Sequence, residues 1–147
     1  MRVYIAGDHA AFDMKEFSKV ELENLGFEVV DLGCFSKDRV DYPDFAHDLA
    51  NKVLNDDGSK GVLICGTGIG ISIAANRHAK IRCALCHDKE TATLAREHND
   101  ANVLAYGARI NSKESISEML NAFFSTEFSG GRHTNRVAKI ELGDKNE

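Results

Sequence analysis

The residues best suited to chemistry are a cysteine and the glycines that follow it, in the segment Cys65-Gly66-Thr67-Gly68-Ile69-Gly70. Such closely spaced glycines let the backbone approach a ligand, and a helix that begins nearby directs free N–H groups at it. We expect this segment to bind an anion or an oxygen that acquires negative charge. The same N–H groups would favour the thiolate of Cys65, the reactive form of cysteine. Without the glycines, a buried structural cysteine would be the better interpretation.

Further polar residues stand directly after other apolar runs, in Gly7-Asp8-His9, His87-Asp88 and Gly107-Ala108-Arg109. If these runs are parallel strands, their carboxyl ends meet at one edge of a sheet, where ligands bind in such folds. Asp8 is as well suited to capping a helix as to catalysis, and one residue can do both. His9 alone indicates nothing specific.

Two arginines near the end of the chain, Arg132 and Arg136, are four residues apart and would share one face of a helix, with His133 beside them. Two guanidinium groups on one face can bind a phosphate. Taken alone, the pair is better explained as the solvated end of a basic helix. The phosphate interpretation gains weight only together with the other segments.

The elements that would position these residues alternate between short apolar runs and longer segments of helical period. The runs are Val3 to Ala6, Val29 to Leu32, Val62 to Cys65, Cys83 to Cys86 and Val103 to Tyr106. Strands joined by crossover helices lie parallel and are buried on both faces. The pattern therefore predicts an α/β fold, a Rossmann-like three-layer sandwich with an open parallel sheet of about five strands and helices on both faces.

The first two helices are predicted from apolar residues at helical spacing. Phe17, Val20 and Leu25 mark one that Gly26 closes, and Phe45, Leu49 and Val53 mark another that Pro43-Asp44 starts. Further helices are expected after Gly70, Asp88 and Ser112.

Length favours one domain over residues 1–147, with a loose tail at 143–147. A formal net charge of -5 argues against broad nucleic-acid binding, which depends on clustered Lys and Arg. The first residues enter a strand pattern without a charged and apolar leader, and no apolar run is long enough to cross a bilayer. We therefore expect a cytoplasmic protein without membrane or nucleic-acid partners.

The four cysteines, Cys34, Cys65, Cys83 and Cys86, fit no small secreted disulfide framework and are expected to be reduced. Cys83 and Cys86 have the spacing of a redox or zinc motif. Residues three apart on a strand point to opposite faces, however, so we favour a place in the core for both.

A dinucleotide site is a weaker alternative for the glycine segment. Asp88 follows Gly66 at about the distance of the acidic residue that binds the ribose in a Rossmann motif. The glycine spacing is G-x-G-x-G rather than G-x-G-x-x-G, and the segment follows the third predicted strand. NAD binding is therefore kept only as an alternative.

Five segments occur in order along the chain: Gly7-Asp8-His9, Asp41-Tyr42-Pro43, the run from Cys65 to Asn76, the run from Arg96 to Leu104, and Gly130-Gly131-Arg132-His133. Together they resemble type B ribose-5-phosphate isomerase, over nearly the whole chain. Galactose-6-phosphate isomerase subunits belong to the same superfamily. The ordered set is far more specific than any one of its motifs.

The resemblance implies a role for each matching residue. Cys65 would be the proton-abstracting base with Thr67 beside it, and His98 would assist opening of the sugar ring. Asp8, His9 and Tyr42 would line the pocket, Asp8 with a part in catalysis. The backbone of Gly66, Gly68, Ile69 and Gly70 would bind the developing oxyanion, Asn99 would hold the enediolate or a hydroxyl, and Arg109, Arg132 and Arg136 would bind the phosphate.

The expected reaction interconverts ribose 5-phosphate and ribulose 5-phosphate, a step of the non-oxidative pentose phosphate pathway, with no metal and no cofactor. The resemblance also implies a homodimer or a dimer of dimers with shared sites, since His98 and Asn99 precede the fifth strand and need not reach Cys65 within one subunit. Two alternatives stay open. One is a hexose-phosphate isomerase acting on galactose 6-phosphate or allose 6-phosphate, and the other is a nucleotide-binding regulatory module.

Overall fold

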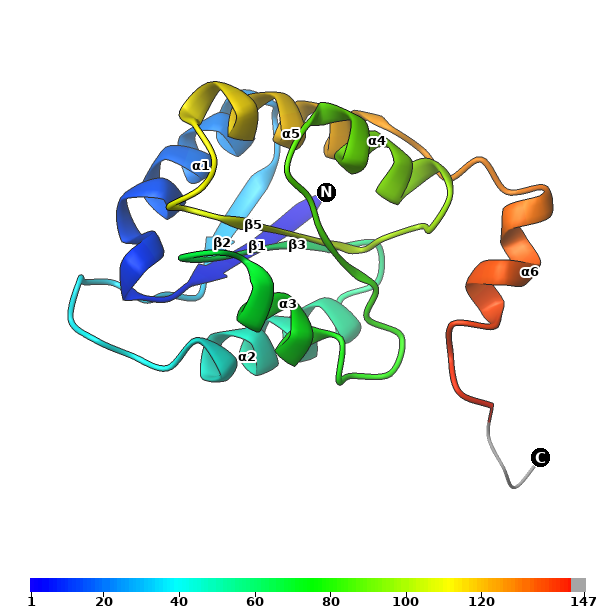
Figure 1. Ribbon diagram of the computed structural model, residues 1–147, viewed down its shortest axis with the longest axis horizontal. Helices are drawn as coiled ribbons and strands as arrows, with labels where there is room; N and C mark the ends of the chain where they lie inside the picture. The colour runs from blue at the N-terminus through cyan, green and yellow to red at the C-terminus, as the bar shows by residue number, and fades with distance from the viewer. Residues whose placement is uncertain (144–147) are drawn as a thin grey trace.

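Five parallel strands form the centre of the protein, a computed structural model that we describe over residues 1–143 (Figure 1). The strands are β1 (Arg2–Gly7), β2 (Glu28–Asp31), β3 (Lys60–Cys65), β4 (Cys83–Leu85) and β5 (Val103–Gly107). Their order across the sheet is β2-β1-β3-β5-β4, and every pair is parallel. Each predicted run therefore overlaps a strand. Apart from Gly143, the expected loose tail lies outside the described residues.

Helices cover both faces of the sheet, as predicted for a three-layer sandwich (Figure 1). On one face lie α1 (Phe12–Asn24), α4 (Lys89–Glu97) and α5 (Lys113–Ser125), and on the other lie α2 (Tyr42–Leu54) and α3 (Ile69–Ala75). A short 3-10 turn, His9–Ala11, precedes α1. The last helix, α6 (Arg132–Ala138), stands beyond the sheet and has no buried residue. No helix of residues 1–143 combines the length and apolar character needed to cross a membrane.

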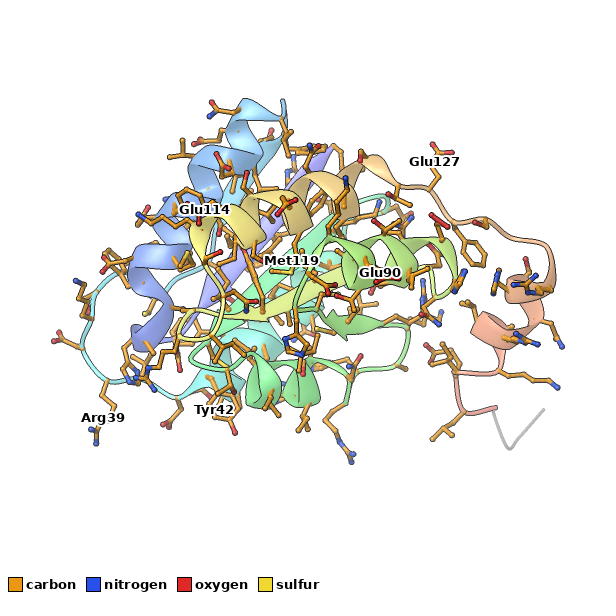
Figure 2. All side chains as sticks on the ribbon, turned by 45° about the horizontal axis from the view of Figure 1, so that its top comes forward. Arg39, Tyr42, Glu90, Glu114, Met119 and Glu127 are labelled. Atoms are coloured by element: carbon orange, nitrogen blue, oxygen red, sulfur yellow. The ribbon has the colours of Figure 1, made fainter. Side chains whose placement is uncertain are left out.

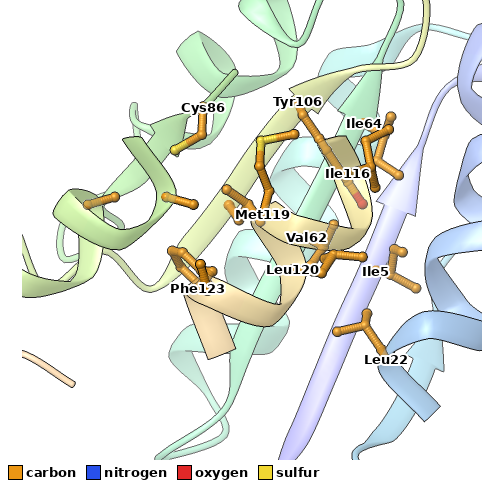
Figure 3. Close-up of a cluster of buried hydrophobic side chains, with 14 of the residues drawn as sticks. Ile5, Leu22, Val62, Ile64, Cys86, Tyr106, Ile116, Met119, Leu120 and Phe123 are labelled. Carbon is orange, nitrogen blue, oxygen red and sulfur yellow. The ribbon is translucent and has the colours of Figure 1, made fainter. Parts of the chain in front are cut away.

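Two hydrophobic cores lie on opposite faces of the sheet. One contains Ile64 and Tyr106 of the strands with residues of α1, α4 and α5 (Figure 3). The other contains Leu63 and Ala105 with residues of α2 and α3. Neighbouring strand residues thus enter different cores, because successive side chains of a strand point to opposite faces. Both faces are apolar, so each strand appears in the sequence as a continuous apolar run.

Local signals explain where the helices begin. Pro43 lies in the first turn of α2, where its missing N–H has no helical partner to lose. Asp88 caps α4 by accepting the Thr91 N–H at 2.8 Å, and Ser112 caps α5 by accepting the Ser115 N–H at 3.1 Å. The predicted third helix begins at Ile69, so Gly70 lies inside it.

The predicted apolar face of the first helix was right for Phe17, which packs against a core, and wrong for Val20 and Leu25. Val20 is 54% exposed and Leu25 is 42% exposed, whereas the buried residues of α1 are Lys15, Ser18 and Leu22. Lys15 and Ser18 are polar, which hid this face from a search for apolar spacing. They are tolerated in the interior because each has a hydrogen-bond partner there.

The strand order reverses between β1 and β3. β2 lies on the outer side of β1, and the chain then crosses back to place β3 on the inner side. Gly7 at the end of β1 is in register with Ile64 near the end of β3. In open α/β sheets, the crevice outside such a point is where ligands bind.

Candidate active site

Three loops meet at the carboxyl edge of the sheet and are held together by backbone hydrogen bonds. The Asp8 N–H donates to the Ile64 carbonyl at 3.2 Å, which joins the loops after β1 and β3. The Ala108 and Arg109 N–H groups donate to the Cys65 and Gly66 carbonyls at 2.8 and 3.0 Å, which joins the loops after β3 and β5. The strand order therefore brings together residues from the start, middle and end of the sequence.

Cys65 is the last residue of β3, and only 5% of its surface is exposed. Its Sγ accepts a hydrogen bond from the Gly68 N–H at 3.1 Å. Gly68 has φ of 79°, and a Cβ atom there would lie 2.7 Å from the Tyr106 carbonyl carbon, so the turn requires glycine. A backbone N–H that points at sulfur stabilises a thiolate, and a thiolate at this position could accept a proton from a ligand.

Several backbone N–H groups of the same turn are available to a ligand. The Ile69 N–H donates to the Thr67 Oγ1 at 3.2 Å. Within the described chain, the N–H groups of Gly66, Thr67 and Gly70 have no hydrogen-bond acceptor. Free backbone donors on one turn can hold an oxygen that becomes negatively charged.

Arg109 and Tyr42 cover the two ends of the glycine segment. The Arg109 Nη1 lies 3.1 Å from the position that a Cβ would take at Gly66. At Gly70, a Cβ would lie 2.6 Å from the Tyr42 Cζ, so only glycine permits this close approach. Figure 2 shows Tyr42 beside α3, and the residue is 39% exposed. A cation and an aromatic ring thus flank the turn that carries Cys65.

Asp8 and His9 follow β1 in the same crevice. Asp8 is 7% exposed, and its Oδ1 accepts the Ala10 N–H at 3.1 Å, so it is a helix cap as one of the two interpretations predicted. The His9 Nδ1 accepts the Val40 N–H at 3.1 Å. In the neutral ring this places the proton on Nε2, which can then donate to a ligand.

The loop after β2 fixes the position of these residues, and sequence analysis missed it. The Gly7 N–H donates to the Gly33 carbonyl and the Cys34 N–H donates to the Gly7 carbonyl, both at 2.8 Å. The Gly33 N–H in turn donates to the Asp31 Oδ1 at 2.9 Å. The one available signal was Asp31, an acidic residue near the end of a predicted strand, because a buried charge needs a partner.

Asp31 also binds two lysines of α1. Its Oδ2 accepts from the Lys15 Nζ at 2.5 Å and from the Lys19 Nζ at 2.9 Å. Burial acts to raise the pKa of Asp31, but these hydrogen bonds and the one from Gly33 outweigh it, so the pKa lies below its ordinary value. Lys15 is completely buried, and its Nζ lies near the rings of both Phe12 and Phe35. The network ties α1 to the loop that supports Asp8.

A second group of expected site residues lies elsewhere, at the turn between α4 and β5. His98 caps the carboxyl end of α4, and Asn99 lines a cleft of about 370 Å³. The other residues that line this cleft are Asn76, Ile81, Arg82, Cys83, Ala84, Ala101 and Ile140. Arg96 supports the turn from inside, donating from Nη1 to the Asp100 Oδ1 at 2.8 Å and to the Ala101 carbonyl at 2.7 Å.

The arginines of α6 join this second group. Arg132 and Arg136 lie on one helix, as the spacing predicted, and both are exposed. The His133 ring stacks on His98, with ring centroids 4.3 Å apart. The pKa of His133 is lowered by partial loss of water and then by the positive neighbours His98, Arg132 and Arg136, while Glu97 opposes them.

The two groups lie at opposite ends of the strands. Cys65 is in register with Gly107, and Gly61 is in register with Val103. At the ordinary rise of a strand, these two pairs are about 13 Å apart along the strands. His98 and Asn99 come before Val103 in the chain. In Figure 1, α6 stands at the right and the loop after β1 stands at the left. One subunit therefore does not unite Cys65 with His98, Asn99, Arg132 and Arg136.

The dinucleotide alternative is not supported by the geometry. β5 lies between β3 and β4 in the sheet. The loop after β4, which carries Asp88, is therefore not next to the glycine segment that follows β3. Asp88 instead caps α4, since its Oδ1 accepts from both the N–H and the hydroxyl of Thr91 at 2.8 Å. A Rossmann acid instead ends the strand next to the glycine loop and faces the ribose.

Cys83 and Cys86 lie on opposite faces of the sheet, one against each core, as predicted. Burial raises the pKa of both thiols, that of Cys86 to about 11. Neither has the character of a reactive thiolate. Among residues 1–143, no three His, Cys, Asp or Glu side chains gather in a metal-binding arrangement.

Comparison with known proteins gives one family. The family model described as Ribose/Galactose Isomerase matches residues 3–140. Ribose-5-phosphate isomerase B of Escherichia coli is 43% identical over 133 residues, which are 90% of this chain and 89% of that protein. The solved structure of ribose 5-phosphate isomerase B from Anaplasma phagocytophilum is 51% identical with a TM-score of 0.90, and covers 95% of each chain. That of the Thermotoga maritima enzyme is 46% identical with a TM-score of 0.92, and covers 95% of this chain and 97% of its own.

Proposed function

The chain belongs to the ribose/galactose isomerase family, and from this premise we propose that it interconverts ribose 5-phosphate and ribulose 5-phosphate with Cys65 as the base. Membership makes it an aldose–ketose isomerase. The observation that carries the proposed role of Cys65 is the Gly68 N–H directed at its Sγ, at the point where the strand order reverses. The reaction would serve the non-oxidative pentose phosphate pathway.

In this proposal the Cys65 thiolate removes the proton from C2 of the open-chain aldose. The electron pair of that bond forms the C1–C2 double bond of an enediolate, and negative charge collects on O1. The N–H groups of Gly66, Thr67 and Gly70 face no protein acceptor, which suits them to stabilise this charge. The thiol then returns the proton to C1, and the O2 hydroxyl proton moves to O1, which completes the ketose.

Thr67 and Asp8 would orient the sugar. The Thr67 Oγ1 accepts from the Ile69 N–H, so its own hydroxyl proton is free to donate to a sugar oxygen. Asp8 has one carboxylate oxygen in the helix cap, which leaves the other for a sugar hydroxyl. Tyr42 would close the pocket over Gly70, and His9 with Arg109 would face the anionic end of the substrate.

The proposed site is completed by a second copy of the chain. His98 would open the sugar ring, Asn99 would bind a hydroxyl or the enediolate, and Arg132 with Arg136 would bind the phosphate, all four from the partner subunit. Two observations support this arrangement. α6 carries both arginines yet buries no residue in its own subunit, and Ile69 and Ile73 expose 50% and 60% of their surfaces on α3, beside the glycine segment.

A homodimer, alone or paired into a tetramer, thus follows from the proposed chemistry. We also propose that the protein acts in the cytoplasm, where thiols stay reduced, because Cys34, Cys65, Cys83 and Cys86 are all unpaired.

The decisive test is the conversion of ribose 5-phosphate to ribulose 5-phosphate by the purified protein, with Cys65→Ala and a Cys34→Ala control assayed beside it. We expect turnover by the native chain and the control, and loss of turnover in Cys65→Ala. Galactose 6-phosphate and allose 6-phosphate are assayed in parallel. Activity on a hexose phosphate alone would refute the pentose assignment, and an active Cys65→Ala would refute the proposed base.

A further inference from the structure

Two histidines that the proposed reaction does not use face one another on the surface. His47 lies in α2 and His78 follows the end of α3. The His47 Nδ1 and the His78 Nε2 are 2.7 Å apart, which is a hydrogen bond in which one ring donates and the other accepts, and the ring planes meet at 54°. The rings therefore meet through their nitrogen atoms and not through their faces.

Such a pair of imidazoles has the chemistry of a transition-metal chelate. Each neutral ring has one nitrogen with a free lone pair, and imidazole is a preferred ligand of Zn²⁺, Ni²⁺ and Cu²⁺. When the proton of this hydrogen bond moves to the far nitrogen of its ring, both lone pairs point at the same small region, so a metal ion would take the place of the hydrogen bond. We propose that His47 and His78 together bind one divalent transition-metal ion, with water as the remaining ligands and no part in the isomerase reaction.

The geometry needs little adjustment. With metal–nitrogen bonds of about 2.05 Å and tetrahedral angles, the two nitrogens lie about 3.3 Å apart, and at right angles about 2.9 Å. The present separation of 2.7 Å widens to these values through small side-chain rotations. His47 is exposed and His78 is half-buried, so both rings have room to rotate.

The surroundings leave space for the water ligands. His78 lines a cleft of about 210 Å³ between the end of α3 and the segment that follows α6. Arg77 and Glu141 line the same cleft, and the Glu141 Oε1 accepts the Lys80 N–H at 2.7 Å. The positive and negative groups near His78 thus offset one another.

The charges around the pair also suit a metal. Asp44 and Asp48 stand on α2 next to His47, and their negative charge favours a cation nearby. A bound ion would tie α2 to the end of α3. Those two helices also carry Tyr42 and Gly70, whose contact covers the glycine segment.

The proposal is tested by calorimetric titration of the purified, untagged full chain with ZnCl₂ alone. We expect one ion per chain and binding at least about tenfold weaker in His47→Ala and in His78→Ala, since each removes one of two protein ligands. His87→Ala is the matched control, because His87 is also exposed but is outside the pair. Unchanged affinity in the two variants, or an equal loss in the control, would overturn the proposal.

A second measurement does not depend on the variants folding. Crystals of the native protein grown with Zn²⁺ should show an anomalous zinc signal between the two rings, and a signal only at the thiols or elsewhere would refute the site.

Discussion

The rings of His98 and His133 are stacked, with centroids 4.3 Å apart and planes 15° from parallel. His98 ends α4 and His133 lies in the first turn of α6. The Ser129 N–H, which donates to the Glu97 carbonyl at 3.0 Å, holds the chain nearby in the same region. The stack therefore helps to fix the position of α6 and of its two arginines, Arg132 and Arg136.

Loss of the stack should lower the catalytic efficiency of the enzyme. For His133→Ala we expect kcat/KM to fall about tenfold or more, mainly through a higher KM, since α6 loses its ring contact with α4. His133→Phe keeps an aromatic ring there and should retain more of the activity. Steady-state kinetics on both variants measure this difference. Equal losses in the two would show that stacking is not what matters, and His87→Ala serves as a control away from the stack.

The pH dependence of stability follows from the lowered pKa of His133. The unfolded chain takes up a proton at this residue near about pH 6.5, and the folded chain does so only at lower pH. Stability should therefore fall as the pH drops from about 7.5 to 5.5, and this residue contributes nothing above that window. Urea denaturation of native protein and His133→Gln at both pH values tests the sign. Between the two pH values, His133→Gln should lose less stability than the native protein. A larger loss in the variant would contradict the lowered pKa of His133.

Alkylation should single out Cys65 among the four thiols, because its Sγ accepts the Gly68 N–H while burial raises the pKa of Cys83 and Cys86. We expect iodoacetamide to inactivate the enzyme, and ribose 5-phosphate to slow the reaction. Mass spectrometry of peptides locates the label. Cys65→Ser should lower kcat by about a thousandfold while leaving the unfolding transition nearly unchanged. Labelling at Cys34 with full retention of activity would contradict the role of Cys65.

The pair Asp31 and Lys15 should be important for stability. Asp31→Asn leaves the completely buried Lys15 without its carboxylate, and breaking a buried pair costs about 3 kcal/mol. Lys19 binds the same carboxylate but is partly exposed, so Lys19→Ala should cost less than about 1 kcal/mol. Urea denaturation compares the two variants. Similar losses in both would mean that burial of Lys15 does not govern the effect.

Shared sites predict complementation between two inactive proteins. Cys65→Ala and His98→Ala subunits, mixed and allowed to exchange, should form heterodimers in which one of two sites has both native residues. Random exchange of a dimer would then restore about a quarter of native activity. Each variant mixed with itself under the same conditions is the control. Activity that never rises above that of the separate variants would show that both residues act within one subunit.

Much of the fold could be predicted from the sequence because its signals are local. The strands are short apolar runs, since a parallel sheet buries both faces, and Asp88 and Ser112 begin helices as side-chain caps. The face of α1 could not be predicted. Its buried residues include Lys15, which is stable in the interior only because Asp31, distant in sequence, lies beside it.

The sequence by itself determined which residue types could do the chemistry, because a thiol followed by closely spaced glycines is a local property of the chain. The tertiary structure decided which of them meet. Strand order joins Asp8, Cys65 and Arg109 at one edge and separates Asp88 from the glycine segment by β5, while His98 and Arg132 lie at the opposite end of the strands. These residues become neighbours because the sheet as a whole must bury both of its faces. No local sequence pattern shows which strands will be adjacent.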